Sequence, residues 1–223
     1  MARLEAAIFD LDGVIVSTDR QHYLAWKRLA DEIGAPFDRE RNEQCRGVDR
    51  MASLRIVLGP GHRYSEAEMT ALAERKNGYY QALIRQISPA DLLPGAAALI
   101  EELERRGVKR AVGSASRNAA AVLERLGIAG KFQAVVTGHD FTRSKPAPDV
   151  FLTAAARLGA APGNCVVFED AAAGVEAAHA GGMKAVGVGR ADLLAAAERV
   201  VDSLAEVSYA DLVRLMEAAP RRG

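Results

Sequence analysis

Four acidic residues follow two short apolar runs of the chain, and a lysine stands between the two pairs in the sequence. Asp10 and Asp12 follow the first run, and Glu169 and Asp170 follow the second. Carboxylates gathered in one place repel one another and stay ionised only when a cation compensates their charge. Ligand sets made only of oxygen favour magnesium, and Lys145 could add a fixed positive charge nearby. These residue types therefore predict a magnesium site built from carboxylates.

Each motif also has an ordinary structural interpretation when it is taken alone. The first acidic pair could form a turn, the second could place charges at a helix N-terminus, and the lysine could be solvated. However, the three features occur in order, each at the carboxyl end of a predicted strand or at the start of the following helix. This combination, rather than any single motif, predicts a functional site.

The expected strands and helices place these motifs at one edge of a sheet. Apolar runs that are too short for helices predict strands over residues 6–9, 109–112, 134–136, 165–168 and 185–188. Helical patterns separate the last four, over residues 96–106, 119–126, 149–158 and 172–180. This alternation predicts an α/β fold with a Rossmann-like parallel sheet. In such a fold the active site lies at the carboxyl ends of the strands.

Residues 16–88 interrupt the alternation, because they contain no convincing strand pattern. Amphipathic helical patterns instead cover residues 20–33, 38–45, 50–58 and 66–87. We therefore predict a catalytic core of residues 1–15 and 89–223, with an inserted α-helical cap domain of residues 16–88. A helical insertion after the first strand is suited to act as a lid over the carboxyl end of the sheet.

The overall composition restricts the class of protein. The chain has 29 Lys and Arg against 29 Asp and Glu, so it lacks the basic surplus of a typical nucleic-acid binder. Its 49% hydrophobic and 26% charged residues indicate a globular protein rather than a disordered one. Cys45 and Cys165 are too few for a disulfide framework or a zinc site. With neither a membrane-length apolar stretch nor room for a signal peptide before the first strand, we expect a soluble, cytoplasmic protein.

The combined motifs of the core resemble the haloacid dehalogenase (HAD) superfamily of phosphotransferases. The resemblance spans about residues 5–188 and rests on Asp10-Leu11-Asp12-Gly13-Val14, Ser114, Lys145 and Glu169-Asp170. It implies that Asp10 is the nucleophile that becomes an aspartyl phosphate. It also implies that Asp12 is the general acid and base, and that the backbone carbonyl of Asp12 is a magnesium ligand.

The same resemblance implies roles for the remaining core residues. Asp170, with Glu169, would complete the magnesium site, and Ser114 and Lys145 would hold the transferring phosphoryl group. A carboxylate attacks phosphorus only when its own charge and the phosphate charge are both screened, which magnesium and Lys145 would do.

Residues of the insertion narrow the resemblance. Thr18, His22 and Trp26 are spaced by four residues, which puts them on one face of a helix. With several further residues they are similar to the β-phosphoglucomutase family, over nearly the full chain. These further residues are Arg46, Gly47, Val48, Arg50 and Ser53 in the insertion, and Ala115, Ser116, Arg117 and Asn118 in the core.

That family interconverts β-D-glucose 1-phosphate and glucose 6-phosphate through β-glucose 1,6-bisphosphate, so its site must hold a second, non-reacting phosphate. Arg50 suits this task, because a guanidinium fork binds phosphate through two hydrogen bonds. Ser116, Arg117 and Asn118 can help through side chains and loop amides at a helix start. Arg117 stands where the family often has lysine and keeps the charge. Asp49 stands where a small hydroxyl residue is frequent and adds a negative charge.

The resemblance implies Mg²⁺ as cofactor and a sugar phosphate and its bisphosphate as ligands. From the charge balance and the apolar runs we expect no nucleic-acid or membrane partner, and we expect a monomer. Some alternatives stay open from the residues alone. Trp26 could pack in the cap, and Thr18 could cap a helix. His22 could be a surface histidine, although its spacing from Asp12 favours a role in positioning that acid. Arg46 and Arg50 could be solvated. A magnesium-dependent sugar-phosphate phosphatase would share the core and the cap. A mutase for another β-sugar 1-phosphate would share them too, whereas a catalytically silent binding module would not need the complete set of core residues.

Overall fold

The computed structural model describes residues 3–45 and 48–218, which divide into two compact units. Unit 1 comprises Met1–Ser17 and Ser88–Gly223, and unit 2 comprises Thr18–Ile87. We call them the core unit and the cap unit. The cap unit therefore begins two residues after the start of the predicted insertion, residues 16–88, and ends one residue before its end. No helix in the described part of the chain is long and apolar enough to cross a membrane.

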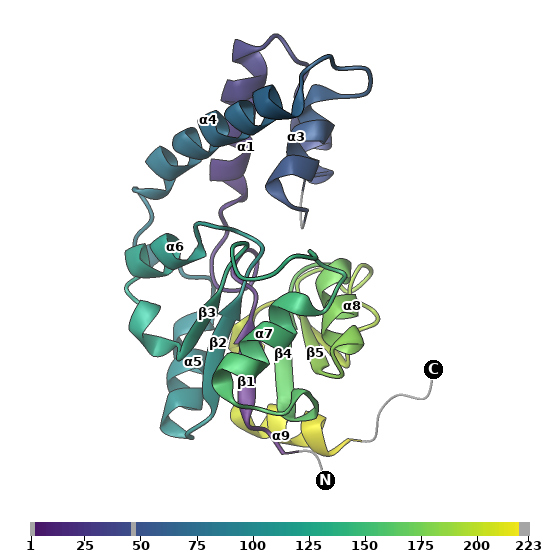
Figure 1. The fold of residues 1–223 in the computed structure, drawn as a ribbon. Helices are drawn as coiled ribbons and strands as arrows, with labels where there is room; N and C mark the ends of the chain where they lie inside the picture. Colours follow the sequence, from purple (N-terminus) through teal and green to yellow (C-terminus); the bar gives the residue numbers. More distant parts are fainter. Residues whose placement is uncertain (1–2, 46–47, 219–223) are drawn as a thin grey trace. The chain divides into compact units, whose positions relative to one another are not determined.

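The core unit is built on a six-stranded parallel sheet in the order β3-β2-β1-β4-β5-β6 (Figure 1). The strands are β1 (Ala6–Phe9), β2 (Lys109–Gly113), β3 (Ala134–Val136), β4 (Cys165–Glu169), β5 (Lys184–Val188) and β6 (Arg199–Val201). The chain moves outward from β1 to β3 and then crosses to β4 on the other side of β1. This reversal opens the sheet beyond the carboxyl end of β1, where α/β proteins bind ligands.

Helices of the core unit alternate with most of these strands, and the last helix follows β6. They are α5 (Ala96–Arg105), α6 (Ala119–Arg125), α7 (Asp149–Leu158), α8 (Ala172–Ala180) and α9 (Tyr209–Glu217), with 3-10 turns at Pro89–Asp91, Ala129–Lys131, Pro162–Asn164 and Leu204–Glu206. Helices α7 and α8 bury their apolar faces against one side of the sheet, in a cluster that includes Ile8, Val167 and Phe151. The predicted α/β class, with a parallel sheet and a helical insertion, is confirmed.

Two elements of the core unit were missing from the prediction. Strand β6 has only two apolar residues, Val200 and Val201, between Arg199 and Asp202, so no apolar run marked it in the sequence. Helix α9 begins with a capping box, in which Ser208 and Asp211 bind each other's backbone N–H groups. That Ser-x-x-Asp pattern, followed by buried Leu212 and Met216 four residues apart, was a usable signal for a helix.

Within its described residues, 18–45 and 48–87, the cap unit contains four helices: α1 (Asp19–Glu32), α2 (Arg39–Glu43), α3 (Arg50–Leu58) and α4 (Glu66–Ile84). Buried side chains of three of them form a separate apolar core that includes Trp26, Leu29, Leu54 and Leu72. Helix α4 starts at a capping box and ends three residues before the predicted end at residue 87. Because α1 and α4 pack together, residues more than fifty positions apart become neighbours.

Candidate active site

Strand register brings the two acidic motifs together. Phe9 of β1 pairs with Phe168 of β4, and the backbone N–H of Asp10 donates to the Phe168 carbonyl at 2.9 Å. Asp10 therefore leaves the sheet beside Glu169. Carboxylate oxygens of Asp10, Glu169 and Asp170 all lie within 4.8 Å of one another. This trio has the composition of a hard-cation site.

Asp12 does not belong to this carboxylate cluster, although the sequence suggested that four carboxylates share one site. The reason is local. Strand β1 ends at Phe9, and the chain bends at Leu11, between the two aspartates. The alternation of side chains that holds in an extended strand therefore no longer relates Asp10 to Asp12. A magnesium contact through the Asp12 backbone carbonyl, which the family resemblance implies, does not require the side chain to join the trio.

Lys145 lies inside the cluster. Its Nζ donates to Asp10 Oδ1 at 2.5 Å and to Glu169 Oε1 at 3.1 Å, and its side chain is 6% exposed. Burial disfavours the ammonium, but the Asp10 and Glu169 carboxylates outweigh this and raise the pKa of Lys145. Lys145 is therefore a fixed positive charge, as the sequence suggested.

The cluster carries more negative charge than Lys145 can balance. Burial, together with repulsion by Asp10 and Asp170, raises the pKa of Glu169 to about 8, although Lys145 opposes the shift. Glu169 therefore keeps its proton at neutral pH until a further positive charge enters the cluster. A divalent cation with oxygen preference fits this charge and donor set. The residues present therefore fit a magnesium ion.

Two glycines allow the trio to form. A Cβ atom on Gly13 would overlap the carboxylate of Asp170, and one on Gly174 would overlap most of the Glu169 side chain. Gly13 belongs to the first motif, but Gly174, in the first turn of α8, was not singled out from the sequence. The sequence did carry a usable sign of it, a glycine inside a helical, alanine-rich segment. Glycine destabilises a helix there, so its presence indicates that another group packs against the backbone at that position.

The loop after β2 carries Ser114 and the predicted phosphate-binding residues. Ser114 is buried, and its Oγ accepts the N–H of Ser116 at 3.1 Å. Ser116 Oγ in turn accepts the N–H of Asn118 at 3.2 Å. These two loop amides thus bind serine hydroxyls, whereas the serine hydroxyl hydrogens and the Arg117 side chain are donors that suit an anion. Arg117 is exposed, and Ala115 between the serines is half-buried.

In the cap unit, His22 lies against a lysine that was not noticed in the sequence. Lys76 Nζ is 2.9 Å from His22 Nδ1, and the ring of Tyr80 lies 4.1 Å from the His22 ring. An ammonium can only donate, so Nδ1 accepts and Nε2 carries the ring proton. Tyr80 also donates to Thr18 Oγ1 at 3.2 Å. The expected link between His22 and Asp12 joins different units and stays a prediction.

We expect His22 to stay uncharged at mildly acidic pH. Burial, with repulsion by Lys76 and Arg50, lowers the pKa of His22 well below 6.5. The unfolded chain therefore binds a proton that the folded chain does not, and the free energy of unfolding should fall as the pH drops below about 6.5. Ring resonances of His22 measured by NMR from pH 7.5 to 5 check this, with the exposed His139 as the comparison ring. Protonation of His22 above pH 6.5 would contradict it.

The other residues predicted in the cap fall into three groups. Trp26 and Ser53 are 2% and 4% exposed, and the Trp26 ring packs in the cap core with Lys76 Nζ 4.5 Å from its centroid. The packing alternative for Trp26 therefore holds, whatever else it contacts. Thr18 stands at the N-cap of α1, but its side chain makes no capping bond. Val48 is exposed, whereas the predicted Arg46 and Gly47 lie outside the described residues.

Asp49 and Arg50 open helix α3. The Asp49 carboxylate accepts the N–H groups of Met51 and Ala52 at 2.8 and 2.9 Å, so it is the N-cap of the helix. A serine or threonine caps a helix equally well, which accounts for Asp49 at a position where the family often has a small hydroxyl residue. Arg50 donates from its two terminal nitrogens to Glu74 and Asn77 of α4.

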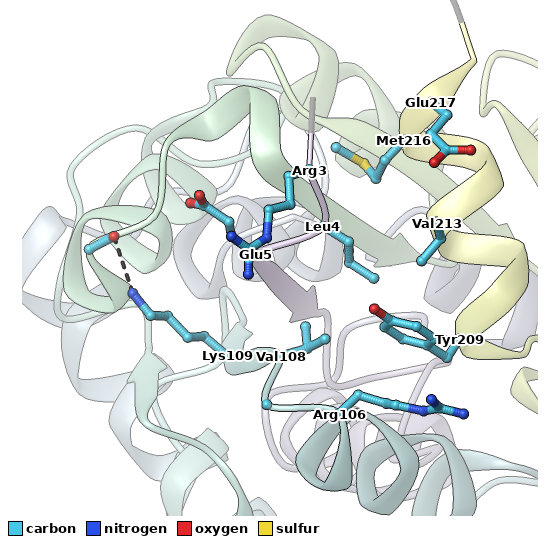
Figure 2. Close-up of a pocket in the computed structure, with 12 residues that line it drawn as sticks. Arg3, Leu4, Glu5, Arg106, Val108, Lys109, Tyr209, Val213, Met216 and Glu217 are labelled. Carbon is cyan, nitrogen blue, oxygen red and sulfur yellow. Dashed lines mark hydrogen bonds between the residues drawn. The ribbon is translucent and has the colours of Figure 1, made fainter. Parts of the chain in front are cut away.

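A pocket of about 540 Å³ lies at the other end of the sheet (Figure 2). Arg3 and Glu5 precede β1 there, and Lys109 begins β2. Lys109 Nζ donates to the carbonyls of Leu158 and Gly159 at 2.7 and 3.3 Å. Because the carboxylate trio follows the carboxyl ends of the strands, this pocket is separate from the candidate active site.

Comparison with known proteins matches the haloacid dehalogenase-like hydrolase family over residues 4–182. The β-phosphoglucomutase of Bacillus subtilis is 43% identical over 208 residues, covering 92% of each chain. The fructose-1-phosphate phosphatase of Escherichia coli is 35% identical over 188 residues, covering 83% of this chain and 97% of the relative. Among solved structures, a β-phosphoglucomutase from Clostridium difficile superimposes with a TM-score of 0.92 at 39% identity, covering 96% of this chain and 97% of the other.

Proposed function

We propose that this chain, which belongs to the haloacid dehalogenase-like hydrolase family, acts as a mutase. Within that family we assign it the interconversion of β-D-glucose 1-phosphate and D-glucose 6-phosphate, an intramolecular phosphoryl transfer. The observation that carries the assignment is the 43% identity to a β-phosphoglucomutase over 92% of both chains. The assigned substrate is a sugar phosphate, and the assigned intermediate is its 1,6-bisphosphate.

Asp10 is the proposed nucleophile. The free hydroxyl of glucose 1-phosphate attacks the phosphorus of the aspartyl phosphate, the bond from phosphorus to the Asp10 oxygen breaks, and Asp12 takes the hydroxyl proton. The resulting bisphosphate turns around, a carboxylate oxygen of Asp10 attacks the other phosphorus, the bond from that phosphorus to the sugar oxygen breaks, and Asp12 gives that oxygen a proton. The hydrogen bond from Lys145 to Asp10 supports this assignment, because it holds the buried carboxylate in place beside a positive charge.

Asp10, the Asp12 backbone carbonyl and Asp170 would hold the magnesium ion, with Glu169 beside them. When bound, the ion would screen the charges of the carboxylate and the phosphoryl oxygens. Ser114 would donate its hydroxyl hydrogen to the transferring phosphoryl group, since its Oγ lone pair already accepts from Ser116. Lys145 would supply the second positive charge.

The mutase assignment requires a grip for the phosphate that does not react. Arg50 is the cap residue that we propose to bind this phosphate. The cap surface predicted around the sugar comprises Thr18, His22, Trp26, Arg46, Gly47, Val48 and Ser53. Ser116, Arg117 and Asn118 would serve the core side. A guanidinium with two terminal nitrogens matches a phosphate in geometry and charge.

A magnesium-dependent sugar-phosphate phosphatase is the second candidate, favoured by the 35% identity to a fructose-1-phosphate phosphatase. One assay separates the two. The enzyme is supplied with β-glucose 1-phosphate, Mg²⁺ and a trace of β-glucose 1,6-bisphosphate, and both glucose 6-phosphate and inorganic phosphate are followed. Glucose 6-phosphate without release of phosphate is the expected result. Inorganic phosphate alone would establish the phosphatase instead, and the α anomer serves as the control substrate.

Replacement of Arg50 by alanine should weaken substrate binding. Charge-assisted hydrogen bonds contribute enough that we expect the KM for β-glucose 1-phosphate to rise about tenfold or more. The small substrate p-nitrophenyl phosphate has no distal phosphate and should be affected much less. Arg55→Ala removes an exposed arginine of the same helix and is the matched control. Equal losses on both substrates would indicate a structural role for Arg50.

A further inference from the structure

Arg50 is held by two residues that lie three positions apart on helix α4. Its Nη1 donates to Glu74 Oε1 at 2.6 Å, and its Nη2 donates to Asn77 Oδ1 at 3.0 Å. The Arg50 side chain is 19% exposed, whereas the Glu74 side chain is 59% exposed. The guanidinium is therefore largely enclosed, and its carboxylate partner approaches it from the solvent side.

The two partners differ in what they do to a bound anion. Asn77 is neutral, so it orients the guanidinium without repelling a phosphate. Glu74 carries a negative charge, and its Oε1 accepts the Arg50 Nη1 hydrogen bond that a phosphate oxygen would otherwise accept. A carboxylate this exposed binds an arginine only weakly, since water and salt compete for both groups. A phosphate dianion can therefore displace it.

We propose that Glu74 is an internal competitor for Arg50 and sets the affinity of the enzyme for the distal phosphate. This inference rests on the proposed function of Arg50 as the distal phosphate grip. The bisphosphate must leave Arg50 when it turns around, so a grip that is too strong would hinder turnover. Tight binding that is equal in the ground state and the transition state does not raise kcat. By competing for Arg50, Glu74 would let the distal phosphate dissociate from the guanidinium.

The substitution Glu74→Gln tests the competition, because glutamine keeps the size and an acceptor oxygen but removes the charge. We expect the KM for β-glucose 1-phosphate to fall about two- to fivefold, the range set by an exposed ion pair. The inhibition constant of inorganic phosphate should fall by a similar factor, and kcat should not rise. An unchanged or higher KM would overturn the proposal.

The structure supplies a matched control on the same two helices. Arg55 Nη2 of α3 lies 3.6 Å from Glu66 Oε1 of α4, and both side chains are well exposed. Glu66→Gln removes one negative charge from the cap without touching Arg50, so KM and phosphate inhibition should not change. If Glu66→Gln lowered KM as much as Glu74→Gln did, a general charge effect would explain the data and the proposal would fail.

A double variant separates this inference from the function on which it rests. In an Arg50→Ala background, Glu74→Gln should change neither KM nor phosphate inhibition, because the guanidinium for which Glu74 and phosphate compete is absent. If Arg50→Ala alone leaves KM unchanged, the proposed phosphate grip is wrong. If Arg50→Ala raises KM but Glu74→Gln does not lower it, the grip stands and only the competition is refuted.

Discussion

Asp10→Asn should abolish turnover, with kcat lower by about 10⁴-fold or more. The amide is nearly the same size as the carboxylate, but it is a poor nucleophile and cannot form an aspartyl phosphate. Because Lys145 still has Glu169 as a partner at 3.1 Å, the folded core should survive the change. Rapid quenching with radiolabelled bisphosphate should therefore detect no phosphoenzyme, while circular dichroism shows a native spectrum.

The control for Asp10→Asn is Asp192→Asn, which removes an exposed aspartate paired with Arg190 in the same unit. That variant should keep full activity. Residual activity of the Asp10 variant within tenfold of the parent enzyme would refute covalent catalysis by Asp10. The chemistry would then have to start from a different residue.

Gly174→Ala should damage the site while leaving the fold intact. The added methyl group would overlap the Oε1, Cδ and Cγ atoms of Glu169, so the side chain must leave its position beside Lys145. Losing a buried residue that positions a metal site typically costs about 10- to 100-fold in metal affinity or activity. We expect a loss of that size in both kcat and the Mg²⁺ affinity measured by calorimetry.

Thermal unfolding makes the Gly174 test specific. Alanine is the better helix former by about 1 kcal/mol, so Gly174→Ala need not lower the melting temperature much. Gly163→Ala is the matched control, since a Cβ atom there meets nothing within 4 Å. If Gly174→Ala retained normal Mg²⁺ affinity and turnover, the position of Glu169 would not matter for the site.

Much of the fold could be predicted because helices and strands leave periodic patterns that are local in sequence. Helices α3, α7 and α8 begin and end at the predicted residues. Strand β6 was missed because its two apolar residues stand between charged ones, and the end of α4 was placed three residues too late. Such errors are small, since they concern where elements stop rather than how the chain is organised.

The candidate site was partly predictable for a different reason. Parallel strands must bring their carboxyl ends to one edge, so acidic residues after β1 and β4 had to approach each other. No comparable rule predicts the contacts of Lys76 and Glu74. Both lie within an ordinary charged helix, and only the packing of α4 against α1 and α3 gives Lys76 its contact with His22 and Glu74 its contact with Arg50.

The sequence by itself determined the residue types for phosphoryl chemistry, the α/β class and the place of the helical insertion, because spacing and periodicity are properties of short segments. Only the tertiary structure decided which carboxylates meet. It places Asp10, Glu169 and Asp170 together without the Asp12 side chain, because strand β1 ends at Phe9 and the chain bends at Leu11. It also supplies the partner of Arg50, since contacts between distant segments depend on register and helix packing that no local pattern encodes.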